Sequence, residues 1–265
     1  MKRHEIVLTD VTAMGGDSVC VAGIDVETGE TLRLSNPQPT RVMATELGFA
    51  PGEVIRVDWG RLERPVAPHV EDGVWQTRSV EKRARLADAQ LASMLAATAF
   101  DGVREAFGDA IVKARNNNHG WPARDGARSL ATIRARYVRF EQVVERRHDG
   151  IEVARIRVSL RDRSNMFWGR IPFQDLTVRA HTYDCDDCKG EGHMHQLRAE
   201  FEANRCLVRV GLTRPYPPDD PDVARCWLQV TNVIGRERSH FLPRWLRAPA
   251  SVAPAPVAHP AAATA

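Results

Sequence analysis

The residues best suited to chemistry in this chain lie between positions 184 and 195, where the sequence reads DCDDCKGEGHMH. Two cysteines stand in a C-x-x-C spacing, and two histidines follow within a few residues. A tight turn with this spacing lets both thiolates reach one ion, and zinc prefers sulfur and imidazole ligands. We therefore predict a structural zinc site, with Cys185, Cys188, His193 and His195 as its ligands.

The last ligand of this predicted site is open. The run C-x2-C-x4-H resembles the first three ligands of a zinc knuckle, a nucleic-acid-binding module, but Arg198 stands where the knuckle has its final cysteine. In an extended strand, H-x-H spacing directs the two rings to opposite sides, so Cys206 or Cys226 could close the site instead. An ordinary polar loop is a second interpretation. A redox pair is a third, which the acidic residues between the cysteines disfavour.

A second pattern lies in the stretch VARIRVSLRDR at residues 153–163. Arginines occupy odd-numbered positions and apolar residues occupy even-numbered ones, so in a strand the arginines share one face and the apolar residues face the core. Guanidinium groups hold phosphates and aromatic rings stack on bases, which is the chemistry that single-stranded nucleic acid requires. The predicted nucleic-acid-binding residues are Arg155, Arg157, Arg161, Arg163, Phe167 and Trp168.

The same alternation has a plainer interpretation, because any half-buried strand shows it. In that case the arginines form a solvated outer face, and Phe167 or Trp168 lies in the core. The net charge of +3 decides little. Arginine supplies nearly all the positive charge, which suits phosphate binding but also follows from a GC-rich genome. Lysine occurs only at Lys2, Lys82, Lys113 and Lys189.

The elements that must position these residues are mainly strands. Period-two alternation and turn residues predict strands, and an Ala- and Leu-rich stretch predicts two helices. The expected strands cover 5–12, a hairpin over 18–35, 52–60, 129–147, 150–164, 206–216 and 224–235; the expected helices cover 84–98 and 101–108; the stretch 116–126 is expected to be a loop, with a short helix near 172–180.

The bulk properties of the chain exclude some classes of protein. No apolar run in the 265 residues approaches the about 20 residues that a membrane helix needs. The basic start lacks the apolar stretch of a secretory signal, which favours a cytoplasmic protein. Five cysteines, an odd number, argue against a disulfide framework, so thiols are free to be core residues or metal ligands.

Several stretches together resemble the dual OB-containing domain family of prokaryotic proteins. They are VCVAGIDVETGETLRL near the start, RSLATI in the middle, and RVGLTRPY followed by CWLQVTNVIG near the end. The resemblance covers about residues 5–236 and implies two tandem OB folds with a nucleic-acid-related role. The expected organisation is a first barrel over 1–80, a helical connection and loop over 81–127, a second barrel carrying the Cys/His loop over 128–236, and a basic arm with a low-complexity Ala/Pro tail over 237–265.

Catalysis is not expected from these residues. The sequence has no G-x-S-x-G, P-loop, H-E-x-x-H or G-x-G-x-x-G motif. A conceivable acid–base set, His119, Arg124 and Asp125, lies in a polar stretch of ordinary composition. We therefore predict a mainly β, cytoplasmic protein of two tandem OB-like Greek-key barrels that binds single-stranded DNA or RNA without catalysis. The alternative is a scaffold or regulatory module that binds a protein partner and is stabilised by a structural zinc.

Overall fold

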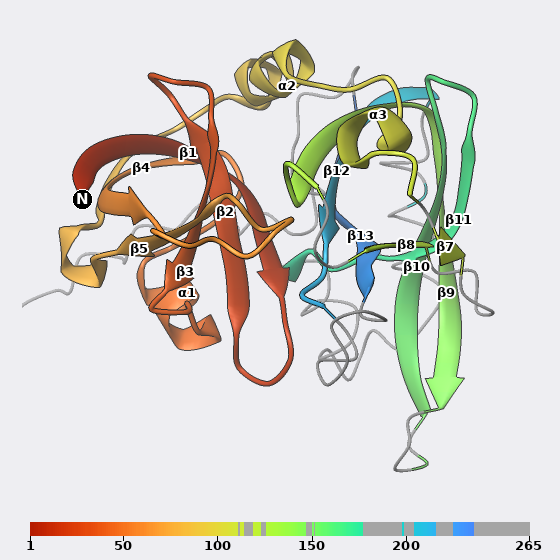
Figure 1. Ribbon diagram of the computed structural model, residues 1–265, viewed down its shortest axis with the longest axis horizontal. Helices are drawn as coiled ribbons and strands as arrows, with labels where there is room; N and C mark the ends of the chain where they lie inside the picture. The colour runs from red at the N-terminus through yellow and green to blue at the C-terminus, as the bar shows by residue number, and fades with distance from the viewer. Residues whose placement is uncertain are drawn as a thin grey trace, which may run out of the picture.

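The computed structural model describes residues 1–110, 112–113, 119–122, 126–146, 150, 152–176, 198, 204–215 and 225–235. In this part of the chain the protein is mainly β, and two barrels lie side by side with α2 (Asp88–Ala97) above their junction (Figure 1). This arrangement confirms the predicted fold class, a mainly β protein of two closed or nearly closed barrels with minor helical content.

The first barrel is a closed sheet. Its strands are β1 (Lys2–Ala13), β2 (Val19–Asp25), β3 (Thr31–Asn36), β4 (Glu53–Arg61), β5 (Asp72–Trp75) and β6 (Glu81–Arg85). Their order is β1-β2-β3-β5-β4-β6, and β1 pairs with both β2 and β4, which closes the sheet. In β4 the side chains of Ile55, Val57 and Trp59 are buried in the barrel core, as the alternation predicts. The short helix α1 (Arg41–Glu46) begins at Thr40, whose side chain accepts from the Met43 amide.

The second barrel is built around one long strand. Its strands are β7 (Val112–Lys113), β8 (His119–Pro122), β9 (Leu130–Arg146), β10 (Glu152–Asp162), β11 (Phe167–Pro172), β12 (Asn204–Leu212) and β13 (Arg225–Gly235). The order is β11-β10-β9-β12-β13-β8-β7, and β9 pairs with both β10 and β12. A bridge between Phe173 and Val230 brings the end of β11 to β13, so the barrel is nearly closed.

The connection between the barrels differs from the expected one at both ends. β6 pairs with β4, so the first sheet continues to Arg85, beyond the predicted boundary at residue 80. The stretch 116–126, expected to be a loop, contains β8, which pairs with β13. Besides α2, the connection holds α3 (Val103–Phe107), and a 3-10 helix (Thr77–Ser79) precedes β6. No helix in the described residues is long and apolar enough to cross a membrane.

The two barrels share a buried interface. Its apolar part joins Val7 and Val54 of the first barrel, Leu91 and Leu95 of α2, and Leu207 of the second barrel. The polar part depends on a bulge in β1, where the register shifts between Leu8 and Asp10. The bulge reverses the alternation, so Asp10 points at the second barrel while its apolar neighbours still face the core.

Asp10 forms a buried ion pair across this interface. Both residues of the pair are almost fully buried, and Arg209 Nη2 lies 2.5 Å from Asp10 Oδ2. Asp10 also accepts hydrogen bonds from the hydroxyls of Thr9 and Thr231, and Arg209 donates to the Thr132 hydroxyl. A buried pair is tolerated only when its remaining lone pairs and protons are satisfied, as they largely are here. The barrels are therefore joined by a specific contact as well as by apolar packing.

Candidate nucleic-acid interface

The arginine pattern of β10 has the predicted orientation. Ile156, Val158 and Leu160 are buried in the core of the second barrel. Arg155, Arg157 and Arg161 lie on the opposite, outer face, and Arg163 follows at the end of the strand in an exposed position. The sequence therefore placed the arginines of this strand on the correct side of the sheet. Their surroundings come from the neighbouring strands.

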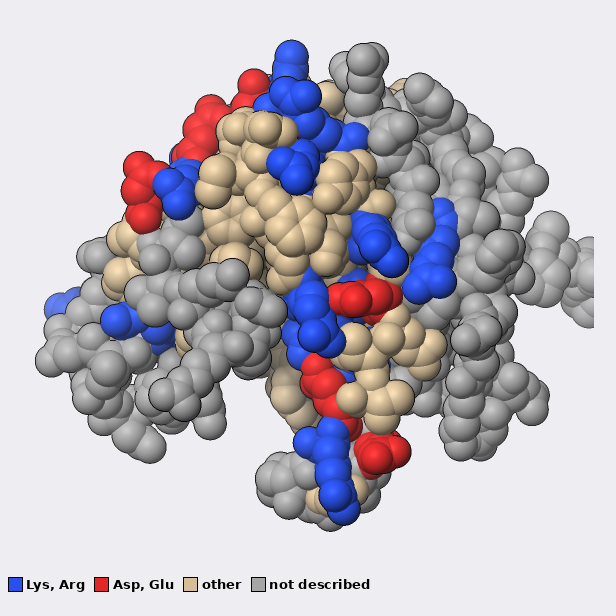
Figure 2. Space-filling model, turned by 90° about the vertical axis from the view of Figure 1, so that its right-hand side faces the viewer, with Lys and Arg blue, Asp and Glu red and all other residues tan. Residues whose placement is uncertain are grey.

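Strand β9 brings carboxylates to the part of this face nearest the β9–β10 hairpin. Glu141 lies directly opposite Arg157 in the strand register. Arg157 Nε donates to Glu145 Oε1 at 3.0 Å, and Arg170 Nε lies 3.2 Å from Glu141 Oε1. Figure 2 shows the result, because blue and red side chains alternate in the lower part of this view. Sequence analysis missed these acids, since only the register of β9 against β10 places them beside the arginines.

The part of the face nearest the β10–β11 turn is different. Arg136, Arg139 and Arg163 are exposed there, and the Phe167 side chain is 52% exposed. The Arg161 guanidinium lies 6.0 Å from the centre of the Phe167 ring, within the range of a cation–π contact. Blue side chains gather around uncharged surface in the upper part of Figure 2. We call this region the basic turn surface: Arg136, Arg139, Arg161, Arg163, Met166 and Phe167.

One carboxylate lies at the edge of the basic turn surface. Asp101 Oδ1 is 3.7 Å from Arg163 Nη1 and 3.0 Å from Arg134 Nη1. The side chain of Arg163 is nevertheless 62% exposed, so its guanidinium can still reach an anion from solvent. Exposed ion pairs of this kind contribute little free energy, so Arg163 can replace Asp101 by a phosphate as its partner at little cost in free energy.

Buried Asp162 fixes the shape of the turn. Its Oδ1 accepts from the Met166 amide at 2.9 Å and from the Ser164 hydroxyl at 2.6 Å. Its Oδ2 accepts from Trp168 Nε1 at 2.8 Å and from the Val103 amide at 3.2 Å. The carboxylate thus connects both sides of the turn to the core and to α3. The exposed residues between them are held in a defined position.

Trp168 does not belong to the outer face. It is 2% exposed, its ring stacks on Trp121 with centroids 6.1 Å apart, and His119 packs edge-on against it at 5.0 Å. The prediction that Trp168 contacts nucleic acid is therefore wrong for this conformation, and the alternative that it lies in the core holds. The register explains this, because Trp168 pairs with buried Leu160 while Phe167 pairs with Arg161 on the outer face. Of the conceivable acid–base set, His119 is committed to this packing, while Arg124 and Asp125 lie outside the described residues.

The predicted zinc ligands Cys185, Cys188, His193 and His195 lie outside the described residues. Where the structure does describe the chain, it brings together no group of three or more His, Cys, Asp or Glu side chains able to hold a metal. Burial raises the pKa of Cys206 to about 12 and that of Cys226 to about 11. Both thiols lie in the buried core of the second barrel. The zinc site stays a prediction, and metal analysis of protein purified without a histidine tag would test it.

No family model, curated protein or solved structure matches the chain. The resemblance to the dual OB-containing domain family is therefore untested by these comparisons and stays a prediction. The two barrels agree with the fold that this resemblance implies.

Proposed function

We propose that the protein binds single-stranded nucleic acid on the basic turn surface of its second barrel, without catalysing a reaction. The observation that carries this proposal is the exposed ring of Phe167 beside the Arg161 guanidinium, on a turn that buried Asp162 holds in place. A strand passing over this surface meets a ring that can stack on a base and guanidinium groups that can bind the flanking phosphates. Arg155 and Arg157 extend the same face of β10 toward the hairpin.

The arrangement favours a single strand over a duplex. A stacking contact needs an unpaired base with an accessible face, and Phe167 stands at a turn rather than inside a deep groove. Tandem barrels with such a face are compatible with OB-like recognition, in which a sheet face and its loops contact the strand. Phosphate contacts by arginine carry no base preference, so we expect weak dependence on sequence.

The test is a titration of labelled oligonucleotides followed by fluorescence anisotropy at two salt concentrations, with single-stranded DNA, single-stranded RNA and duplex. The Arg161→Glu/Arg163→Glu variant should bind every single strand more weakly. Its log–log salt dependence should be shallower by about 1.4, because each lost phosphate contact removes about 0.7 from the slope. The Arg64→Glu/Arg83→Glu variant is the matched control, since it changes the charge equally at exposed positions of the first barrel.

Phe167 provides the second arm of the test. Phe167→Ala should weaken binding by about 1–3 kcal/mol, whereas Phe167→Tyr keeps a ring and should bind nearly as well as the wild type. Unchanged affinity in the folded double arginine variant, or equal binding by the alanine and tyrosine variants, would contradict the proposal.

A protein partner is the second candidate, and one observation favours it. Met166 and Phe167 are adjacent exposed apolar side chains, 38% and 52% exposed, and such pairs also occur in protein interfaces. Absence of binding to any oligonucleotide at low salt would favour this alternative. The predicted structural zinc is compatible with either function.

A further inference from the structure

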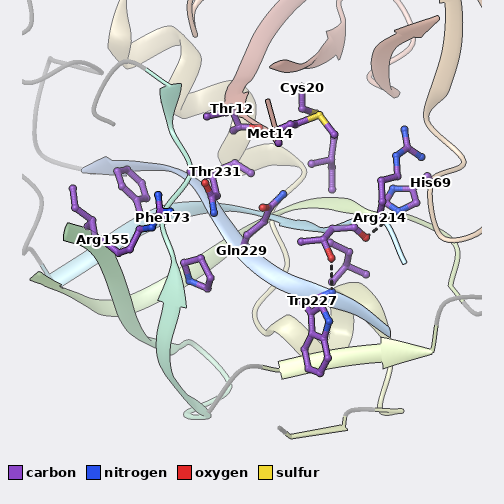
Figure 3. A pocket seen from close by; sticks show the side chains of 18 of the residues that line it. Thr12, Met14, Cys20, His69, Arg155, Phe173, Arg214, Trp227, Gln229 and Thr231 are labelled. Atoms are coloured by element: carbon purple, nitrogen blue, oxygen red, sulfur yellow. Dashed lines mark hydrogen bonds between the residues drawn. The ribbon is translucent and has the colours of Figure 1, made fainter. Parts of the chain in front are cut away.

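A cleft of about 620 Å³ lies between the two barrels, away from the basic turn surface. The first barrel contributes Thr12, Cys20 and His69 to its walls, and the second barrel contributes Arg214, Trp227 and Gln229. In Figure 3 these side chains surround one space, with Arg155 at one end and Arg214 with His69 at the other. The volume falls within the roughly 300–1,000 Å³ typical of small-molecule sites.

The described walls of this cleft carry more cationic than anionic side chains. Four arginines line it, namely Arg33, Arg155, Arg157 and Arg214, against one carboxylate, Glu145. Asp72, which is not part of the lining, pairs with Arg33 and Arg214 and neutralises part of this charge. Cationic walls around a partly enclosed space concentrate the positive potential inside it. The charge of the cleft therefore suits an anionic ligand.

Arg33 is a buried cation with an unused donor. The residue is 5% exposed, and its guanidinium donates to Asp72 Oδ1 at 3.0 Å and to the Ser129 hydroxyl at 2.6 Å. Its Nη1 also lies 3.0 Å from His69 Nδ1. Arg33 Nε, however, has no hydrogen-bond partner among the residues that the structure describes. Buried donors are nearly always satisfied, so the Arg33 guanidinium has hydrogen-bonding capacity that its described contacts do not use.

His69 also lines the cleft, and both of its ring nitrogens are engaged in hydrogen bonds. Because Arg33 donates to Nδ1, the ring must accept there and donate from Nε2 to the Thr213 carbonyl oxygen at 3.1 Å. Burial, together with the charges of Arg33 and Arg214, lowers the pKa of His69 to about 3. The ring is neutral at physiological pH, so it adds no charge to the cleft, and Asp72 and Glu145 are carboxylates that pair with the lining arginines.

Arg157, which also lines the cleft, has a second unused donor. Its Nε is bound to Glu145, but its buried Nη1 lacks a hydrogen-bond partner in the described part of the chain. Two guanidinium groups from two different barrels thus line one cleft with a donor each left over. An oxyanion with several acceptor oxygens is the chemical group that satisfies such donors best.

We propose that the interbarrel cleft binds a phosphate ester of about mononucleotide size, with its phosphate on the arginines and its organic part toward Trp227 and Gln229. The phosphate ester could belong to a free nucleotide or to a phosphate of a bound strand. No residue of the basic turn surface lines the cleft, although Arg155 and Arg157 belong to the same face of β10, so only the alternative with a bound strand rests on the proposed function. Neutral nucleosides lack the group that the arginines recognise and bind poorly.

The test is calorimetric titration of the full chain with AMP, CMP and inorganic phosphate at constant ionic strength, with adenosine and cytidine as ligands that lack phosphate. The wild type should bind the monophosphates at least tenfold more tightly than the nucleosides. Arg157→Gln should weaken monophosphate binding at least tenfold, and Arg155→Gln provides an independent variant should the first fail to fold. Arg83→Gln, at an exposed position of the first barrel outside the cleft, should bind as the wild type does.

Competition identifies the source of the phosphate. Displacement of bound AMP by a single-stranded oligonucleotide would assign the cleft to a strand, and simultaneous binding of both would assign it to a free nucleotide. Absence of heat with every phosphate ester at millimolar concentration would overturn the proposal. Equal monophosphate binding by the wild type and by a folded Arg157→Gln variant would overturn it as well.

Discussion

Asp162 is a buried carboxylate whose described hydrogen bonds all come from uncharged donors. The four donors belong to three structural units: Ser164 and Met166 to the turn itself, Trp168 to the core, and Val103 to the start of α3. A single side chain therefore connects the exposed turn to the barrel. This makes the geometry of the basic turn surface depend on a residue that never contacts a ligand.

We expect Asp162→Asn to destabilise the protein by about 2–4 kcal/mol, because the amide nitrogen faces two donors and leaves them unsatisfied. The same variant should weaken binding to single strands, since the turn that carries Phe167 loses its support. Chemical denaturation measures the first effect and anisotropy the second. Ser164→Ala, which removes only one donor to Asp162, is the control and should cost about 1 kcal/mol. An Asp162→Asn variant as stable as the wild type would show that the carboxylate does not hold the turn.

His69 makes stability depend on pH in a defined window. Its pKa is lowered to about 3 in the folded protein from an ordinary value of 6.5, so the unfolded chain binds the proton first as the pH falls. The contribution is fully present above about pH 6.5 and is lost progressively between pH 6.5 and pH 3. Between pH 7.5 and pH 5 the wild type should lose about 2 kcal/mol of unfolding free energy through this residue.

His69→Gln isolates that contribution. A glutamine can accept from Arg33 and donate to the Thr213 carbonyl oxygen without titrating. The variant should therefore show a shallower fall in unfolding free energy over the same pH range, measured by denaturant titration at each pH. Parallel pH profiles for the two proteins would show that His69 is not the titrating group.

At the scale of elements, the pairing of β9 with β10 decides which arginines are available. The register places Glu141 opposite Arg157 and within ion-pair distance of Arg170, so the hairpin half of the arginine face is partly neutralised. The half of the face nearest the β10–β11 turn is not paired with Glu141 or Glu145. The same strand thus carries a mixed surface at one end and a cationic surface at the other.

Glu141→Gln should strengthen the binding of single strands by about 0.2–1 kcal/mol and steepen its salt dependence, because Arg170 and Arg157 become freer to meet phosphates. Glu63→Gln makes the same change of charge at an exposed position of the first barrel and should leave affinity nearly unchanged. Anisotropy at two salt concentrations distinguishes the two variants. An equal effect from both would indicate that only the net charge matters.

Sequence patterns predicted which side chains face the core where the pattern lies within a single strand. The alternation of Ile156, Val158 and Leu160 with the arginines is a local property, because the core face of a strand is read directly from its side-chain period. The same reasoning could not separate Phe167 from Trp168. Phe167 is exposed because it pairs with Arg161, whereas Trp168 is buried because it pairs with Leu160 and donates a hydrogen bond to Asp162.

Contacts between distant segments were out of reach of such patterns. The strand β6 was expected to belong to a helical connection, because the stretch that begins at residue 81 is rich in Ala, Leu, Glu and Arg. Only its pairing with β4 identifies it as a strand. The cleft joins Arg33 and His69 of one barrel to Arg157 and Arg214 of the other. No spacing or motif in the sequence predicts that these four residues lie in one cleft.

At the scale of the whole molecule, the two barrels form one unit rather than two independent modules. They share the apolar cluster around α2 and the buried pair of Asp10 with Arg209. Although burial raises the pKa of Asp10, the Arg209 charge and the hydrogen bonds lower it below its ordinary value, so the carboxylate stays ionised. The cleft exists only because this interface fixes one barrel against the other.

The ion pair gives a test of that coupling. Arg209→Met removes the only cation that the structure describes in contact with Asp10 and leaves its charge buried, so it should destabilise the protein by about 3–5 kcal/mol. The Asp10→Asn/Arg209→Met variant removes both charges and should recover a substantial part of that loss, measured by guanidinium denaturation. Because the interface also positions the walls of the cleft, the single variant should bind phosphate esters more weakly than the double variant does. Additive effects of the two substitutions would mean that Asp10 and Arg209 act separately, and that apolar packing alone holds the barrels together.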